Sequence, residues 1–176
     1  QLPCPEMSHP GTQRLFTDLQ FPRPDGRAAL LARDYKEPAE TTTNEYPFVL
    51  ITGRLACHFN TRTRTGRIKY LQDIEPDNFV EIHPVDAKNL GIAEGDMVVV
   101  TSRRGSVRGV ARIKDRLLIG NVFMSMHFGK AFLAGDDKLA KLVCNPVYDV
   151  HSKQPEFKYC AVKVTKSAVD KERAVL

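Results

Sequence analysis

Short apolar segments separated by turn residues dominate the chain from residue 47 onward. Residues 47–51 and 97–101 are almost wholly apolar, whereas 79–83 and 107–113 alternate apolar and polar side chains. Continuous apolar runs of about four to eight residues are typical of fully buried strands, and alternation is typical of strands with one face in solvent. We therefore expect 97–101 to be buried on both faces, and the two alternating segments to be buried on one face only.

Turn residues join two of these segments directly. Arg103-Arg104-Gly105-Ser106 lies between 97–101 and 107–113, which predicts a β-hairpin. Further strands are expected at 122–125 and 159–164. A total of about six or seven short strands, without regular alternation of strand and helix, favours a compact β-barrel.

Helix signals are few and short. Pro84 precedes residues 85–90 and Gly91 follows them. Proline suits the first position of a helix and glycine suits the residue just past its end, so a short capped helix is expected there. Two other short helices are expected near 65–72 and 136–142. The predicted fold class is therefore mainly β with short helices.

Residues 1–46 differ in composition from the rest of the chain. They are rich in Pro and polar residues, with a strong turn signal at 21–26. Such a segment has little means of folding alone, so we expect an extended connector from a preceding region, with one short strand at 27–31. The barrel is expected to span 47–166 and a charged tail 167–176. With 42% hydrophobic residues in 176, the chain can bury one sizeable core.

The four cysteines, Cys4, Cys57, Cys144 and Cys160, are isolated from one another. No C-x-x-C pair or cluster typical of zinc or iron–sulfur sites occurs, so no metal site is expected within this chain. Scattered single cysteines are typical of a reducing compartment, which predicts a cytoplasmic protein with Cys144 and Cys160 as buried apolar residues. No apolar run approaches the roughly 18–20 residues of a membrane span. Any export signal of a longer protein would lie upstream.

The residues that follow the first strand combine several anion-binding groups. Thr52-Gly53-Arg54 supplies backbone N–H groups, a hydroxyl and a guanidinium, a mixture that suits a pyrophosphate. The net charge is +5, and basic residues gather after this point at Arg54, Arg62, Arg64, Arg67 and Lys69. A basic loop attracts a small anion or a nucleic acid. The chain has no Trp and no alternation of aromatic with basic residues for base stacking, so nucleic acid is the weaker candidate.

This loop resembles the opening of the C-terminal molybdopterin-dinucleotide-binding domain of prokaryotic molybdenum and tungsten oxidoreductases, especially formate dehydrogenases and nitrate reductases. Other motifs follow in the order that family shows, and together they cover nearly the whole chain. They are Pro3-Cys4-Pro5, 9–12, 79–87, 90–96, 98–105, Asn145-Pro146, 152–158 and 160–164. The resemblance implies a double-psi β-barrel preceded by the extended connector.

The resemblance also implies which residues bind the cofactor, with none of them catalytic and none a metal ligand. Arg54 is expected at a phosphate or pterin oxygen, and Lys158 is expected to reach the cofactor from the final strand. Two positions depart from the family pattern: Ser125-Met126 replaces the usual Pro-Phe, and Lys141 stands where relatives carry Asn. The full expected set is Thr52, Gly53, Arg54, Leu55, Cys57, His58, Phe59, Asn60, Thr61, Met126, His127, Lys141, Asn145 and Lys158.

The implied function is to hold one half of a bis(molybdopterin guanine dinucleotide) cofactor carrying Mo or W. By resemblance, the metal-ligating residue and any iron–sulfur cysteines belong to a preceding region, so the chain alone is expected to have no turnover. Its expected partners are the upstream domains or subunits of the same oxidoreductase, and the sequence does not indicate the electron-transfer partner. The start of the chain favours formate dehydrogenase slightly.

Three alternatives remain open at this point. The chain could be the C-terminal domain of an assimilatory nitrate reductase, which residues 63–67 and 152–155 resemble as much. It could be a non-catalytic, stand-alone cofactor-binding subunit. The weakest alternative is a small basic β-barrel that binds RNA, whose affinity would fall steeply with salt.

Overall fold

The computed structural model describes residue 4 and residues 6–32, 34–128 and 143–168. The chain divides into two compact units, Gln1–Glu37 and Pro38–Leu176. In the first unit, hydrogen bonds from Phe21 N–H to Gly26 O and from Gly26 N–H to Arg23 O close the turn expected at 21–26. The strand expected at 27–31 is wrong, since these residues have no regular structure. A strand needs a partner to accept its backbone hydrogen bonds, and none pairs with this segment.

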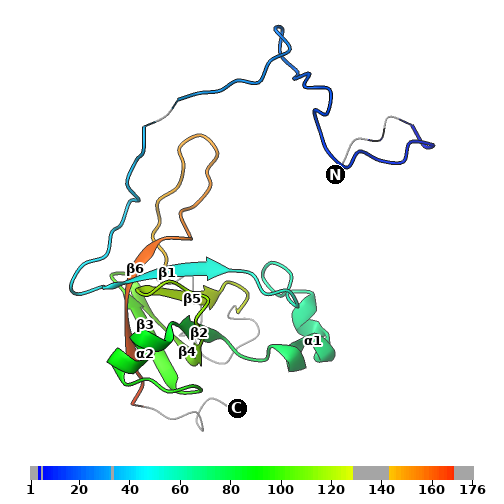
Figure 1. Cartoon of the computed structure of the whole chain (residues 1–176). Coiled ribbons are helices and arrows are strands. Elements are labelled where there is room, and N and C mark those ends of the chain that lie inside the picture. Colours follow the sequence, from blue (N-terminus) through cyan, green and yellow to red (C-terminus); the bar gives the residue numbers. More distant parts are fainter. Residues whose placement is uncertain (1–3, 5, 33, 129–142, 169–176) are drawn as a thin grey trace. The chain divides into compact units, whose positions relative to one another are not determined.

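The second unit contains a closed barrel of six strands (Figure 1), with the order β1-β5-β2-β4-β3-β6. Two pairs, β1 with β5 and β2 with β4, are parallel, and the other four are antiparallel. The expected mainly β barrel is therefore confirmed, and the closed mixed sheet is compatible with the double-psi arrangement. The strands are β1 Phe48–Gly53, β2 Phe79–Ile82, β3 Met97–Ser102, β4 Gly105–Ile113, β5 Asn121–Ser125 and β6 Cys160–Lys166.

The burial of β2 and β3 is the reverse of what their sequences predict. All four residues of β2 are buried, because Arg116 pairs with Glu81 and Arg112 lies over the Phe79 ring. In β3 only alternate residues are buried, with Val98 and Val100 fully inside and Val99 half-buried. Val is favoured in strands by its branched Cβ as well as by burial, so an apolar run does not require two buried faces.

The short helices lie where turn and cap signals predict them. Helix α2, Pro84–Leu90, begins after His83, whose ring accepts a hydrogen bond from Val85 N–H, and ends at Gly91 with φ 65°. The 3₁₀ helix η1, Thr65–Arg67, and helix α1, Lys69–Ile74, occupy the segment expected near 65–72. The β3–β4 hairpin is also confirmed, with Ser102 paired to Gly105. The helix expected near 136–142 lies outside the described residues.

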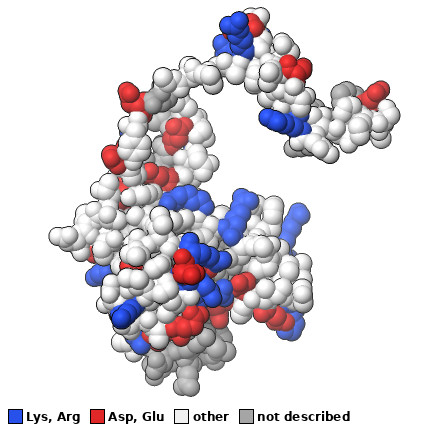
Figure 2. All heavy atoms as spheres, viewed as in Figure 1, with Lys and Arg blue, Asp and Glu red and all other residues white. Residues whose placement is uncertain are grey.

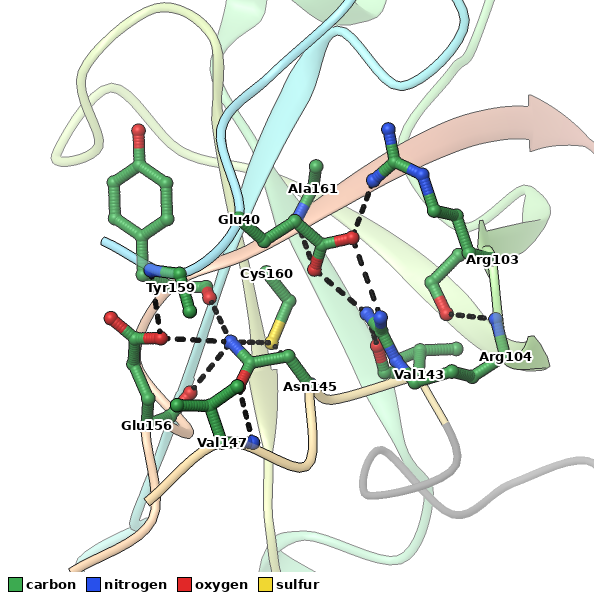
Figure 3. A network of polar contacts seen from close by, with 12 residues as sticks. Glu40, Arg103, Arg104, Val143, Asn145, Val147, Glu156, Tyr159, Cys160 and Ala161 are labelled. Atoms are coloured by element: carbon green, nitrogen blue, oxygen red, sulfur yellow. Dashed lines mark hydrogen bonds and ion pairs between the residues drawn. The ribbon is translucent and has the colours of Figure 1, made fainter. Parts of the chain in front are cut away.

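Residues just before β1 are bound to the barrel by Glu40 (Figure 3). Its carboxylate accepts hydrogen bonds from Arg103 at 2.5 Å and from Arg104 at 2.8 Å, and also from Ala161 N–H at 3.3 Å. Burial works to raise the pKa of Glu40, but the hydrogen bonds from Arg104 and Arg103 prevail and lower it. The compact unit accordingly starts at Pro38, within the segment expected to be a connector.

Candidate functional site

The candidate site begins where two parallel strands end together. Gly53, the last residue of β1, lies opposite Ser125, the last residue of β5, and Met126 N–H donates to Gly53 O at 2.9 Å. Because the strands are parallel, the segments that follow them leave from the same end of the barrel, toward the side where α1 lies (Figure 1). Barrel mouths are frequent ligand sites. The topology thus brings Thr52-Gly53-Arg54 together with Met126 and His127.

Gly53 is required at this point by close packing. A Cβ built on it would overlap the ring of Phe123, lying 3.0 Å from Cζ and closer still to Cε2. The neighbouring Thr52 is buried, and its hydroxyl donates to Phe157 O at 2.7 Å. The Thr-Gly pair therefore holds the end of β1 tightly, and the chain becomes exposed at Arg54.

His127 fastens the loop after β1 to the end of β5. Its ring is fully buried, Nε2 accepts a hydrogen bond from Leu55 N–H at 2.7 Å, and Nδ1 lies 2.5 Å from Asn60 O. An Nε2 that accepts requires the proton to be on Nδ1, so the ring is neutral. Burial lowers the pKa of His127, the Asn60 hydrogen bond opposes this, and the charges of His58, Arg54 and Arg62 lower it further.

This neutral ring predicts a specific pH dependence of stability. The ordinary pKa of a histidine is 6.5, and the pKa of His127 in the folded chain is lower. Below about pH 6.5, His127 is therefore protonated to a greater extent in the unfolded chain than in the folded chain, which favours unfolding. We expect the wild type to lose stability as pH falls through this range, and His127→Gln to lose less. Urea unfolding at about pH 8 and about pH 5 measures both. If the difference in free energy of unfolding between the wild type and His127→Gln is the same at both pH values, the prediction is contradicted.

His58 lies inside the same loop rather than on its surface. It is 4% exposed, with Nδ1 3.3 Å from Thr65 Oγ1 and Nε2 3.2 Å from Glu75 O. Both ring nitrogens therefore have protein partners. His58 is placed to hold the loop together, whereas the sequence suggested a direct ligand contact.

The far end of the loop is anchored to β4. Glu75 accepts two hydrogen bonds from Arg112, at 3.0 Å from Nη1 and 2.6 Å from Nη2. The Arg112 guanidinium also lies 3.7 Å from the centroid of the Phe79 ring. This paired and stacked arginine joins the loop to the buried strand β2, so both ends of the loop are fixed by side chains from distant strands.

Several expected site residues remain on the accessible surface of the loop. Arg54 is exposed, and its guanidinium forms no hydrogen bond or ion pair with another described residue. Phe59 is 60% exposed and Met126 40% exposed, which is high for large apolar side chains. Thr61 is exposed and shares a hydrogen bond with Thr63. Cys57 is half-buried, and burial is the main reason that its pKa is raised.

Lys158 reaches the end of β1 from the opposite end of the sequence. Its ammonium donates a hydrogen bond to Thr52 O, a contact that joins residues 106 positions apart. An ammonium has three donors, and this contact uses one of them. Lys158 was expected to reach the cofactor from the final strand; in the structure it lies just before β6, and closure of the barrel, which pairs β6 with β1, brings it next to the Thr-Gly-Arg turn.

Asn145 uses its side-chain amide on residues that follow it in the chain, among them Glu156 and Tyr159 on either side of Lys158. It is 3% exposed, and Nδ2 donates to Tyr159 O at 2.8 Å and to Glu156 at 3.2 Å, while Oδ1 accepts from Val147 N–H at 3.0 Å. Figure 3 shows these contacts between the segments on either side of residue 150. With both ends of its amide used, Asn145 stabilises this region. Lys141, its expected neighbour in the site, lies outside the described residues.

Two buried polar residues at this site, Ser125 and Arg62, were not among the expected cofactor-binding residues. Ser125, which ends β5 opposite Gly53, is 1% exposed, and its hydroxyl has no hydrogen-bond partner among the residues that the structure describes. Arg62 is 2% exposed, and its Nε and Nη1 also lack partners. In the sequence, Ser125 directly follows the apolar run of 122–124, and this position could have indicated a buried hydroxyl at the end of a strand. Buried polar groups without partners are rare, so both fit a site completed by a polar ligand.

Comparisons with known proteins match the sequence of this chain to one family. Residues 48–161 match the family described as the Molydopterin dinucleotide binding domain. The chain is 40% identical over 164 residues to the F420-dependent formate dehydrogenase 1 subunit alpha of Methanococcus maripaludis, covering 93% of this chain and 23% of that protein. It is 41% identical over 149 residues to a nitrate reductase of Symbiobacterium thermophilum, covering 84% of this chain and 19% of that protein.

A solved structure gives the same fold. Acetylene hydratase from Pelobacter acetylenicus superposes with a TM-score of 0.58 at 20% identity, covering 76% of this chain and 21% of that chain. The chain thus spans about a fifth to a quarter of the length of the proteins it matches. Among the described residues, no helix is both long enough and apolar enough to cross a membrane.

Proposed function

The chain belongs to the family of the Molydopterin dinucleotide binding domain, and from that premise we propose that it holds one half of a bis(molybdopterin guanine dinucleotide) cofactor in a molybdenum or tungsten oxidoreductase. The single observation that carries the proposal is the joint end of β1 and β5, where Gly53 and the partnerless hydroxyl of Ser125 lie opposite each other. A buried hydroxyl there is satisfied when a polar ligand group reaches it.

The side chains around this point divide into binding and supporting roles. Arg54 would bind a phosphate or pterin oxygen, since an exposed guanidinium without a described partner is available for a charged hydrogen bond. Lys158 would orient the ligand with its remaining N–H donors, and Phe59 with Met126 would cover an apolar ring face. His127 and His58 would hold the loop in shape. When bound, the cofactor supplies redox chemistry through the metal on its dithiolenes.

We propose formate dehydrogenase as the parent enzyme, with an assimilatory nitrate reductase as the alternative. The formate dehydrogenase relatives are 39–40% identical over 92–94% of this chain. The nitrate reductase relatives are either 41% identical over 84% of it or 34–35% identical over 92–94% of it. The remaining length of such an enzyme would carry the metal ligand and any iron–sulfur cluster, and its other subunits would be the partners. A cytoplasmic location is supported by Cys144 and Cys160, which are buried and are not joined in a disulfide. A stand-alone subunit would use the same binding residues.

The charge distribution also supports a small anionic ligand. On the face shown in Figure 2, groups of Lys and Arg lie among Asp and Glu instead of forming one continuous basic surface. A long nucleic acid needs several phosphates neutralised along its length, whereas one pyrophosphate needs only a local cluster.

The proposal predicts the effect of Arg54→Ala on cofactor retention. Loss of a charged hydrogen bond costs about 1.5–3 kcal/mol, so we expect affinity to fall roughly ten- to hundredfold. The measurement is the guanine nucleotide released by acid from the purified oxidoreductase that contains this domain. Lys69→Ala is the control, because Lys69 is exposed and its ion pair with Asp73 lies on the surface of α1. Full nucleotide content in a folded Arg54→Ala enzyme would remove Arg54 from the site.

A further inference from the structure

Arg62 is a buried cation. Its side chain is 2% exposed, and neither Nε nor Nη1 has a hydrogen-bond partner. Within the described residues no carboxylate forms an ion pair with it. Burial lowers the pKa of Arg62, and the charges of Cys57 and Asp77 oppose that effect from a distance. Arginine nevertheless stays protonated in proteins, so the charge remains.

A second arginine shows what this arrangement lacks. Arg112 lies over the ring of Phe79 at 3.7 Å and also binds Glu75 through two nitrogens. Arg62 lies over the ring of Phe128 at 4.5 Å, but its Nη1 has no hydrogen-bond partner among the described residues, whereas Nη1 of Arg112 binds Glu75. Stacking on an aromatic ring offsets only part of the cost of burying a charge. The fold therefore holds a guanidinium ready for an anion from outside the described residues.

The backbone around Arg62 is also strained. Asn60 and Arg62 have φ of 45° and 65°, in the left-handed region that is unfavourable for residues with a Cβ. The intervening Thr61 is exposed. Because the free nitrogens lie below the surface, an anion reaches them only when this turn shifts.

We propose that Arg62 is the receptor for the pyrophosphate of the bound dinucleotide. This rests on the proposed function, in which a guanine nucleotide joined to a pterin occupies the site. The pyrophosphate is the strongly anionic part of such a ligand, since the guanine and pterin rings are neutral. Arg62 lies in the loop that begins at Arg54 and is held by His127, so the same loop contains both Arg62 and Arg54. Phosphate suits a guanidinium because its anionic oxygens accept charge-assisted hydrogen bonds, and Nε and Nη1 of Arg62 are two such donors.

The test compares Arg62→Met with Arg64→Met in the full chain. Methionine matches the arginine stem but carries no charge, and Arg64 is an exposed arginine two positions away. Calorimetric titration with GDP, which has a pyrophosphate, is compared with titration by guanosine, which has none. We expect the wild type and Arg64→Met to bind GDP alike, and Arg62→Met to bind it at least about tenfold more weakly. The affinity for guanosine should be the same in the three proteins. Arg62→Lys keeps the positive charge but not the planar guanidinium, so its affinity for GDP should lie between those of the wild type and Arg62→Met.

Thermal unfolding without ligand supplies the second readout. Removing a buried charge that lacks a partner should leave the melting temperature of Arg62→Met unchanged or raised. A fall of more than about 5 °C would show that Arg62 supports the fold itself, and the proposal would be overturned. Equal GDP affinity in Arg62→Met and wild type overturns the role of Arg62 alone. An absence of GDP binding by the wild type and Arg64→Met contradicts the proposed function as well.

Discussion

Val100→Asp is expected to abolish folding of the barrel. Val100 is fully buried in the core, paired with Val107 on one side and Val164 on the other. A carboxylate at this position would have no partner and no water. The cost is several kcal/mol, which is comparable with the total stability of about 5–15 kcal/mol of a domain. We expect the variant to be insoluble or to lack a cooperative unfolding transition.

Val99→Asp is the matched control for this prediction. Val99 is the preceding residue of the same strand, but it is half-buried and lies opposite Arg108 of β4, whose side chain is exposed. A carboxylate opposite an arginine across two strands is favourable or neutral. The control chain should fold and show β-type circular dichroism. If both variants fold, or neither does, the observed alternation of burial in β3 would be refuted.

The second large effect is expected for Asn145→Asp. The substitution keeps the shape of the side chain but replaces an amide that donates to Tyr159 O and to Glu156 by a carboxylate that cannot donate. The introduced charge would be buried, and it would face the Glu156 carboxylate. Loss of the donor and the like-charge contact together should cost about 3–5 kcal/mol.

Urea unfolding at several pH values checks this prediction. The introduced carboxyl should have a raised pKa, so the destabilisation should shrink as acid protonates it and restores a donor. Asn44→Asp makes the same chemical change at an exposed position, and its free energy of unfolding should lie within about 0.5 kcal/mol of that of the wild type. A stable Asn145→Asp chain that loses cofactor would instead place Asn145 in the binding site.

Local features of the chain were predictable because their causes are local. Pro84 and Gly91 set the ends of α2, and Arg103-Arg104-Gly105-Ser106 set the hairpin between β3 and β4. The Thr-Gly-Arg turn was recognised at the end of β1, where a glycine is needed against Phe123. Cap, turn and strand propensities act over a few residues, so the printed sequence contains them.

The placement of site residues was less predictable. His58 was expected to face a ligand, but in the structure its two nitrogens bind Thr65 and Glu75 within the loop. Asn145 was expected to bind the cofactor, and in the structure its amide binds Tyr159 and Val147. Arg62 was read as one basic residue among several, and nothing in its neighbours along the chain signals burial. Whether a polar side chain turns inward depends on partners that lie far away in sequence.

The sequence by itself determined the family, the strand-rich character and the residue types offered at the loop. The tertiary structure alone decided which of those residues meet. Barrel closure brings Lys158 to Thr52 across 106 residues and pairs β1 with β5, so that His127 reaches Leu55. It also decided that β2, and not β3, is covered on both faces. The physical reason is that local conformation follows from neighbouring residues, whereas burial and hydrogen-bond satisfaction follow from which distant strands the closed barrel places together.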